Sequence, residues 1–112
     1  MPKDPAPARL TIVLADWCPH CVPLSDEKTR ELGARLGVPV RRLDIDDAQQ
    51  EREADVLVRD HGDWSADYLI PQVFLEWSDG RVEHLLTGVP GPISGTGRAW
   101  EAVLQDRRFQ AD

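Results

Sequence analysis

The chain has 112 residues, the size of one domain with a modest core. Its net charge of -7, from 13 basic and 20 acidic residues, argues against nucleic-acid binding, which requires a basic face. The apolar runs are shorter than the roughly 18 residues of a membrane span, and residues 1–8 lack the apolar segment of a secretory signal. We therefore expect a cytoplasmic protein with no membrane partner.

The hydrophobic pattern predicts the order strand, helix, strand, helix, strand, strand, helix. A flexible tail with three prolines is expected over residues 1–8, and a single domain over residues 9–112. The predicted strands cover residues 10–15, 38–45, 71–77 and 81–87, and the predicted helices cover residues 22–36, 47–61 and 98–108. A helix between the first two strands makes them parallel. The chain therefore predicts an α/β fold with a mixed four-stranded sheet and helices on both faces.

Short polar and glycine-rich signals mark the boundaries of these elements. Asp46 or Asp47 is predicted to cap the second helix, with Gln49 or Gln50 as its capping-box partner. An Asp-Gly pair at residues 79–80 predicts a tight hairpin between the last two strands. The segment from Asp63 to Leu69 is expected to be a loop, and the role of Trp64 within it stays open between packing and substrate recognition.

The only two cysteines, Cys18 and Cys21, are three positions apart. A disulfide that closes so small a loop constrains the unfolded chain little, and permanent disulfides are rare in a reducing cytosol. The pair is therefore interpreted as chemical rather than structural. We expect the chemistry to need no cofactor beyond a redox-active disulfide between Cys18 and Cys21.

The predicted position of Cys18, after a strand and at the opening of a helix, favours a reactive thiolate. Unpaired backbone N–H groups and the positive end of the helix dipole would face its sulfur. His20 is expected to tune this thiol by a charge or a hydrogen bond, and Pro19 by restricting the opening turn. Cys21 lies one turn later, close enough to attack a mixed disulfide on Cys18.

A metal site is the structural alternative for the two thiols. Zinc requires four ligands, and the remaining soft ligands are His20, His61 and His84, without a second cysteine pair. His61 and His84 are expected to be surface or half-buried residues. We expect no metal ligands in this chain.

The run Ala-Asp-Trp-Cys-Pro-His-Cys at residues 15–21 resembles the active-site segment of thioredoxin-fold oxidoreductases. The Cys-Pro-His-Cys pattern is similar to that of DsbA-type enzymes. Ile70-Pro71 resembles the cis-proline segment of the family, and Thr87-Gly88 resembles the glycine after its last strand. The resemblance extends over about residues 9–106 and implies a thioredoxin-like fold of the shorter glutaredoxin type, with the order βαβαββα.

The resemblance also implies the roles of individual residues. Cys18 would be the attacking thiol and Cys21 the resolving thiol. The Ile70–Pro71 bond would be cis and would lie beside the sulfurs. The residues expected to bind substrate are Trp17, Ile70, Pro71 and Gly88.

The implied function is thiol–disulfide oxidoreduction on protein disulfides. A glutaredoxin-like enzyme that uses glutathione or another low-molecular-weight thiol is the alternative, and a metal or iron–sulfur module is a third hypothesis. The chain departs from thioredoxin at Ile12, where that family carries a buried Asp, and it lacks a clear match to the glutathione-binding Gly-Gly-acid motif of glutaredoxins. The expected partners are disulfide-bearing proteins and an upstream reductase or low-molecular-weight thiol. The protein itself is expected to be a monomer.

Overall fold

The computed structural model describes residues 4–110. The sheet contains β1 (Pro7–Leu14), β2 (Val40–Asp44), β3 (Gln72–Trp77) and β4 (Val82–Thr87), and the long helices are α1 (Asp26–Leu36), α2 (Ala48–His61) and α3 (Ile93–Leu104). Short irregular or 3₁₀ turns cover Cys21–Ser25 and Arg107–Phe109. The elements follow one another in the predicted order. Within the described residues, no helix is both long and apolar enough to cross a bilayer.

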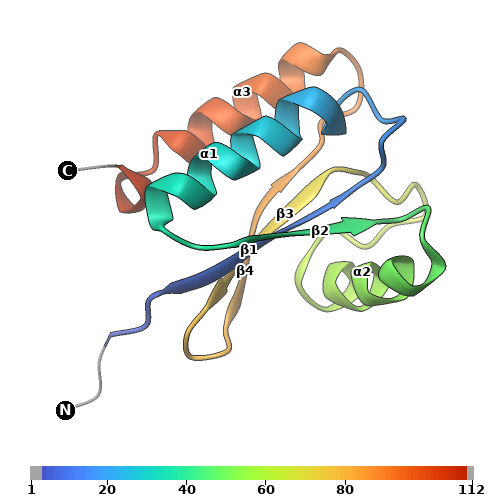
Figure 1. The fold of residues 1–112 in the computed structure, drawn as a ribbon. Coiled ribbons are helices and arrows are strands. Elements are labelled where there is room, and N and C mark those ends of the chain that lie inside the picture. Colours follow the sequence, from blue (N-terminus) through green and yellow to red (C-terminus); the bar gives the residue numbers. More distant parts are fainter. Residues whose placement is uncertain (1–3, 111–112) are drawn as a thin grey trace.

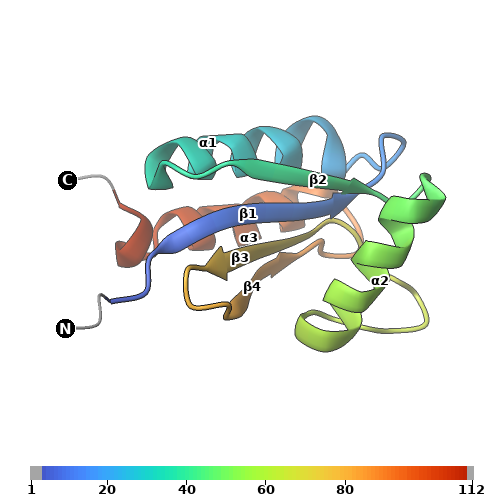
Figure 2. The ribbon, with the colours of Figure 1, turned by 60° about the horizontal axis from the view of Figure 1, so that its bottom comes forward.

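The four strands form one mixed sheet in the order β2-β1-β3-β4, which Figure 2 shows from the side of α2. The inner strand β1 runs parallel to β2 and antiparallel to β3, and β3 and β4 form the predicted hairpin. In the turn between them, Gly80 takes a positive φ of 90°, a conformation that glycine adopts without steric cost. This order places β1, which precedes the thiols, beside β3, which directly follows Pro71.

The helices cover both faces of the sheet (Figure 1). On one face, α1 and α3 pack over a core that includes Leu10, Leu32 and the fully buried Trp100. On the other face, α2 packs over a smaller cluster around Val58 and Phe74. The expected two-sided α/β fold is confirmed, and alternate residues of β1 supply both cores.

The first strand begins earlier than predicted. β1 starts at Pro7, which pairs with Trp77 of β3. The backbone N–H of Ala6 donates a hydrogen bond of 2.9 Å to Ser78 Oγ, and Ala6 O accepts one of 2.8 Å from the N–H of Ser78. Part of the expected 1–8 tail is therefore ordered against the hairpin, while residues 1–3 lie outside the described residues.

The regular part of the first helix begins later than predicted. Residues 21–25 form an irregular turn in which Val22 has extended angles, φ -128° and ψ 127°. A residue that precedes a proline is pushed out of the helical region by the proline ring, and Pro23 also lacks the N–H that a helix would use. Regular α-helix starts only at Asp26, so the expected helix N-terminus at Cys18 is not formed by α1.

The prediction is right for the N-cap of α2 and wrong for the start of α3. Asp47 caps α2 as expected, because its Oδ1 accepts hydrogen bonds of 3.0 Å from the N–H groups of Gln49 and Gln50. The Gln50 side chain accepts from Asp44 N instead of returning to the cap. Helix α3 begins at Ile93, five residues before the predicted start, because the glycine-rich stretch that suggested a loop forms its first turns.

The loop between α2 and β3 is closed by the side chain of Gln72, which is fully buried. Its Oε1 accepts from Asp63 N at 3.0 Å, and its Nε2 donates to Asp63 O at 3.1 Å and to Leu69 O at 2.9 Å. A β-carbon at Gly62 would lie 2.4 Å from Gln72 Oε1, so glycine allows this close approach. Gln72 thereby fixes both ends of the loop that leads to Ile70 and Pro71.

Replacing Gln72 by Met should lower the free energy of unfolding by about 1–3 kcal/mol, because a buried donor and acceptors lose their partners. Urea denaturation would measure this loss. The exposed Gln49 provides the control, since Gln49→Met keeps the backbone cap of α2. Equal stability of the Gln72 and Gln49 variants would contradict the proposed role of the side chain.

Candidate active site

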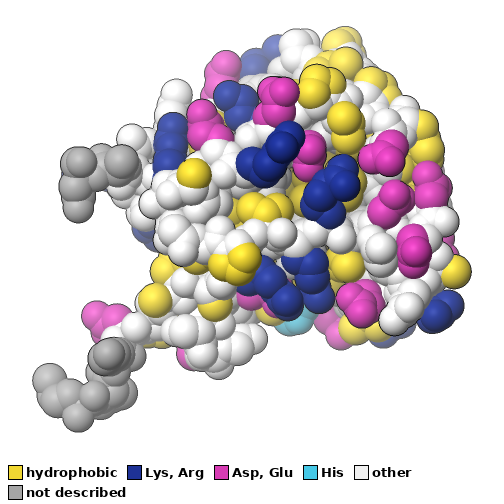
Figure 3. All heavy atoms as spheres, viewed as in Figure 1, with side chains coloured by type: hydrophobic (Ala, Val, Ile, Leu, Met, Phe, Trp, Pro, Cys, Tyr) yellow, Lys and Arg dark blue, Asp and Glu magenta, His cyan; other side chains and the backbone are white. Residues whose placement is uncertain are grey.

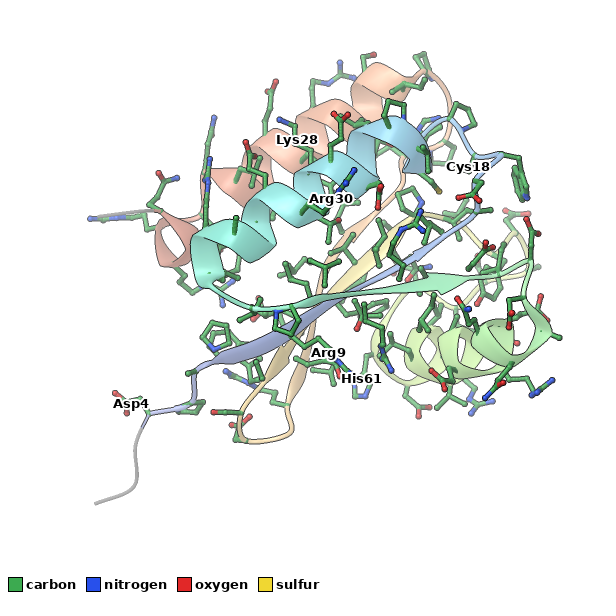
Figure 4. The ribbon with its side chains drawn as sticks, in the orientation of Figure 1. Asp4, Arg9, Cys18, Lys28, Arg30 and His61 are labelled. Carbon is green, nitrogen blue, oxygen red and sulfur yellow. The ribbon has the colours of Figure 1, made fainter. Side chains whose placement is uncertain are left out.

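The two thiols lie in the turn that follows β1, one turn apart. The N–H of Cys18 donates to Ala15 O at 3.1 Å, and the N–H of Cys21 donates to Cys18 O at 3.0 Å. The exposed fraction of Cys18 is 5%, and that of Cys21 is 0%. Figure 4 shows Cys18 at the end of the molecule opposite Asp4. Both cysteines are buried, but Cys18, the outer thiol, keeps a small exposed fraction, whereas Cys21, the inner thiol, has none.

The segment before β3 meets the outer thiol as the resemblance implied. The Ile70–Pro71 peptide bond is cis, and the Cys18 thiol contacts the carbonyl oxygen of Ile70 at 4.0 Å. Pro71 is buried and Ile70 is partly exposed. Residues 52 positions apart in the chain are thus brought together by the pairing of β1 with β3.

Gly88 supports this segment from behind, where it is buried. Its N–H donates to Pro71 O at 2.8 Å. A β-carbon at Gly88 would lie 2.5 Å from Ile70 O and 2.7 Å from Pro71 Cδ. The structure places Gly88 against the segment that faces the thiol, where only a missing side chain allows the contact, and its role in substrate binding stays a prediction.

The surroundings of the inner thiol disfavour its ionised form. Burial raises the pKa of Cys21, and the hydrogen bond with Cys18 raises it further. Desolvation penalises a thiolate that has no water to solvate it. Because the thiolate is the nucleophile and also the form that reacts with alkylating reagents, the raised pKa lowers the reactivity of Cys21.

Alkylation of the reduced protein should label Cys18 first. At mildly alkaline pH we expect iodoacetamide to modify Cys18 at least about tenfold faster than Cys21, because the raised pKa of Cys21 suppresses its thiolate. Digestion and mass spectrometry at successive times would give the two rates. Faster labelling of Cys21 would contradict the assignment of the outer and inner thiols.

His20 is directed away from the sulfurs. Its Nδ1 lies 2.6 Å from Thr96 Oγ1, and its Nε2 lies 2.9 Å from the carbonyl oxygen of Gly91. Because a carbonyl only accepts, Nε2 carries a hydrogen, and in the neutral ring Nδ1 accepts from the Thr96 hydroxyl. Thr96 Oγ1 in turn accepts from Val89 N at 2.9 Å. The described residues contain no hydrogen bond between His20 and either thiol, and the hydrogen bond to Thr96 links His20 to α3.

A second link joins the same turn to α3 through two buried side chains. Ser25 Oγ donates to the carbonyl oxygen of His20 at 2.6 Å and accepts from Trp100 Nε1 at 2.9 Å. The sequence pattern predicted Trp100 as core but gave no role to Ser25 or Thr96. A buried Ser or Thr produces no hydrophobic periodicity in the sequence. Neither residue could therefore be identified without the structure, which shows the turn packed against α3.

The pair His20 and Thr96 should show energetic coupling. We expect His20→Ala and Thr96→Val each to lower the free energy of unfolding by about 1 kcal/mol, since each removes the shared hydrogen bond. The double variant should lose about 1 kcal/mol less than the two separate losses together. Denaturation of all four proteins measures this, and additive losses would show that the hydrogen bond contributes nothing.

A groove lies beside the turn that carries Cys18, between Trp17, the start of α2 and the segment before β3. Its volume is about 360 Å³, and it is lined by Trp17, Ile45, Glu51, Asp67, Tyr68 and Ile70. We call it the Trp17 groove. The Trp17 side chain is 66% exposed at its rim, as expected for a residue beside the site. Trp64, whose role was open, packs edge-on against Tyr68 with ring centroids 5.6 Å apart.

The remaining titratable residues do not converge on a metal site. Over residues 4–110, no group of three His, Cys, Asp or Glu side chains is arranged to hold an ion. His61 is exposed, and His84 lies over the Phe74 ring and contacts Thr87. Pro19 is exposed in the turn between the thiols, where its side chain restricts the backbone.

Comparison with known proteins gives one structural neighbour. No protein-family model matches the chain, and no curated protein matches it. The chain is similar to the crystal structure of the C-terminal domain of Neisseria meningitidis DsbD in the reduced form, with 21% sequence identity and a TM-score of 0.49. The match covers 93% of this chain and 84% of that chain.

The strand order β2-β1-β3-β4, the parallel β1–β2 pair and the final hairpin are those implied by the resemblance. The fold is thioredoxin-like. It lacks any described strand or helix before β1, which corresponds to the shorter glutaredoxin-type order βαβαββα.

Proposed function

We propose that this protein is a thiol–disulfide oxidoreductase that exchanges electrons with protein disulfides through Cys18 and Cys21. The observation that carries the proposal is the position of the two thiols. An edge thiol touches the backbone of Ile70, and a fully buried thiol lies one turn behind it. This arrangement gives one sulfur access to a substrate and keeps the other for the second step.

The proposed reaction proceeds in two exchanges. The Cys18 thiolate attacks one sulfur of a substrate disulfide, forms a mixed disulfide and releases the other substrate sulfur as a thiolate. Cys21 then loses its proton to solvent, attacks Cys18 Sγ and releases the second substrate thiol. The protein dithiol is oxidised to a disulfide and the substrate disulfide is reduced by two electrons. An external dithiol, or an upstream reductase in a reducing cytosol, restores the starting state.

The backbone around Ile70 supports the choice of a protein substrate. An extended chain can pair with exposed backbone groups next to the attacking sulfur, as in strand-addition modes of recognition. The Ile70 carbonyl lies beside Cys18 Sγ, so a substrate chain laid along this segment would bring its own cysteine to the thiol. Trp17 and Ile70 supply apolar surface on either side of that position.

Single-cysteine variants would test the function. Cys18→Ser should abolish the acceleration by the protein of insulin reduction by dithiothreitol, because the attacking thiol is missing. Cys21→Ser should accumulate a mixed disulfide at Cys18, because the resolving step is lost. Turbidity of the released insulin chains measures the first effect, and mass spectrometry of the trapped complex measures the second.

The same variants separate the alternatives. Substantial glutathione-linked activity retained in Cys21→Ser would favour the glutaredoxin-like alternative, which needs chiefly one thiol. Full insulin activity in Cys18→Ser would refute the proposed role of the edge thiol. A visible absorption band that disappears in both variants would indicate a metal or iron–sulfur module instead.

A further inference from the structure

The Trp17 groove combines aromatic and aliphatic walls with two carboxylates. Trp17, Ile45, Tyr68 and Ile70 provide the apolar lining, and the exposed Glu51 and Asp67 provide the charges. In the space-filling view, acidic side chains gather along the right-hand edge, over the loop after β1 and the start of α2 (Figure 3). The groove is thus apolar along its walls and negative in charge.

The charges of the groove are not neutralised by neighbouring cations. Among the residues that the structure describes, neither Glu51 nor Asp67 forms an ion pair. Arg42 forms its ion pairs with Asp16 at 3.5 Å and Asp26 at 3.0 Å. The lining contains no Lys or Arg. A ligand in the groove therefore meets a local field that favours a positive charge.

Two residues of the groove lining are direct neighbours of Cys18. Trp17 directly precedes Cys18, and Ile70 contributes both to the lining and to the 4.0 Å contact with the Cys18 thiol. A substrate cysteine at Cys18 would therefore place one of its neighbouring side chains in the groove. An exposed indole face attracts a cation in addition to providing apolar contact.

Resting on the function proposed above, we propose that the groove selects disulfide substrates in which a lysine or arginine flanks the cysteine that Cys18 attacks. The aliphatic stem of that side chain lies against Trp17 and Tyr68, and its charged head lies between Glu51 and Asp67. Lys and Arg suit such a site because they bury their methylene groups while the charge stays solvated. Glu51 and Asp67 act as specificity-determining residues and take no part in the electron transfer.

Single-turnover rates would test this selection. Reduced protein is mixed with symmetric disulfide dimers of a short peptide in which Lys, norleucine or Glu follows the cysteine. Each exchange oxidises one protein dithiol and releases two peptide thiols. At low ionic strength we expect the Lys peptide to react about fivefold faster than the norleucine peptide and the Glu peptide to react more slowly, in keeping with exposed charge pairs. High salt should reduce the differences.

Two double variants separate the groove from the overall charge of the protein. Glu51→Gln with Asp67→Asn should remove most of the preference for Lys. Asp4→Asn with Glu101→Gln changes the net charge equally at exposed positions outside the groove lining and should retain the preference. Circular dichroism checks that both variants are folded.

Equal rates for the three peptides, or an equal loss of preference in both double variants, would overturn the proposal. Either result would leave the proposed oxidoreductase function intact, because the peptides would still be reduced. If the wild-type protein reduced none of the peptides and no insulin, the proposed function itself would fail.

Discussion

The contact between the Cys18 turn and the backbone of Ile70–Pro71 is the constraint on which the rest of the structure depends. It exists because β1 and β3 are antiparallel neighbours in the sheet, so that β1 ends beside the start of β3. Gly88 contacts this segment from behind, and Gln72 fixes the loop before it. These two residues hold a backbone carbonyl beside a thiol, and the sheet provides the rigid frame.

The turn that carries the thiols is held by hydrogen bonds rather than by a continuous helix. Val22 and Pro23 interrupt the helical path, so the turn cannot depend on α1 alone. His20 and Ser25 connect it to Thr96 and Trp100 of α3. The loop before α3 begins at Gly88, which contacts the Ile70–Pro71 segment, so α3 supports both this segment and the thiol turn. A change in one of them would therefore affect the other through this helix.

Much of the fold was predictable from the sequence because it depends on periodicity and turn chemistry. The buried run in β1, the Asp47 cap and the hairpin at Gly80 are local signals that tertiary contacts did not override. The start of α3 was predicted wrongly because three glycines and two prolines over residues 89–97 indicated a loop. At Gly95 the missing side chain permits close packing against Val89, where a β-carbon would lie 3.1 Å from Val89 Cγ1, so the low helix propensity of glycine does not prevent the helix.

The site was predictable in its sulfurs and its proline, and less so in its surroundings. Cys18, Cys21 and Pro71 were identified from spacing and resemblance. The direction of the His20 ring could not be predicted, because it depends on the buried Thr96, which is 76 positions away in the chain. The Trp17 groove also has no signature in the sequence, since its lining residues come from separate segments of the chain. Its two carboxylates form one negative site only when these segments lie together.

The two ends of the described chain lie on the side of the molecule opposite the thiols (Figures 1 and 4). A surface, resin or neighbouring domain joined at either end would therefore leave the edge with Cys18 facing outward. This geometry suits immobilisation: a layer of molecules attached through Asp4 or Gln110 would turn the Cys18 end of every molecule towards the solution. Under the proposed function, a single-thiol form of such a layer would serve as an affinity matrix that retains the proteins whose disulfides Cys18 attacks.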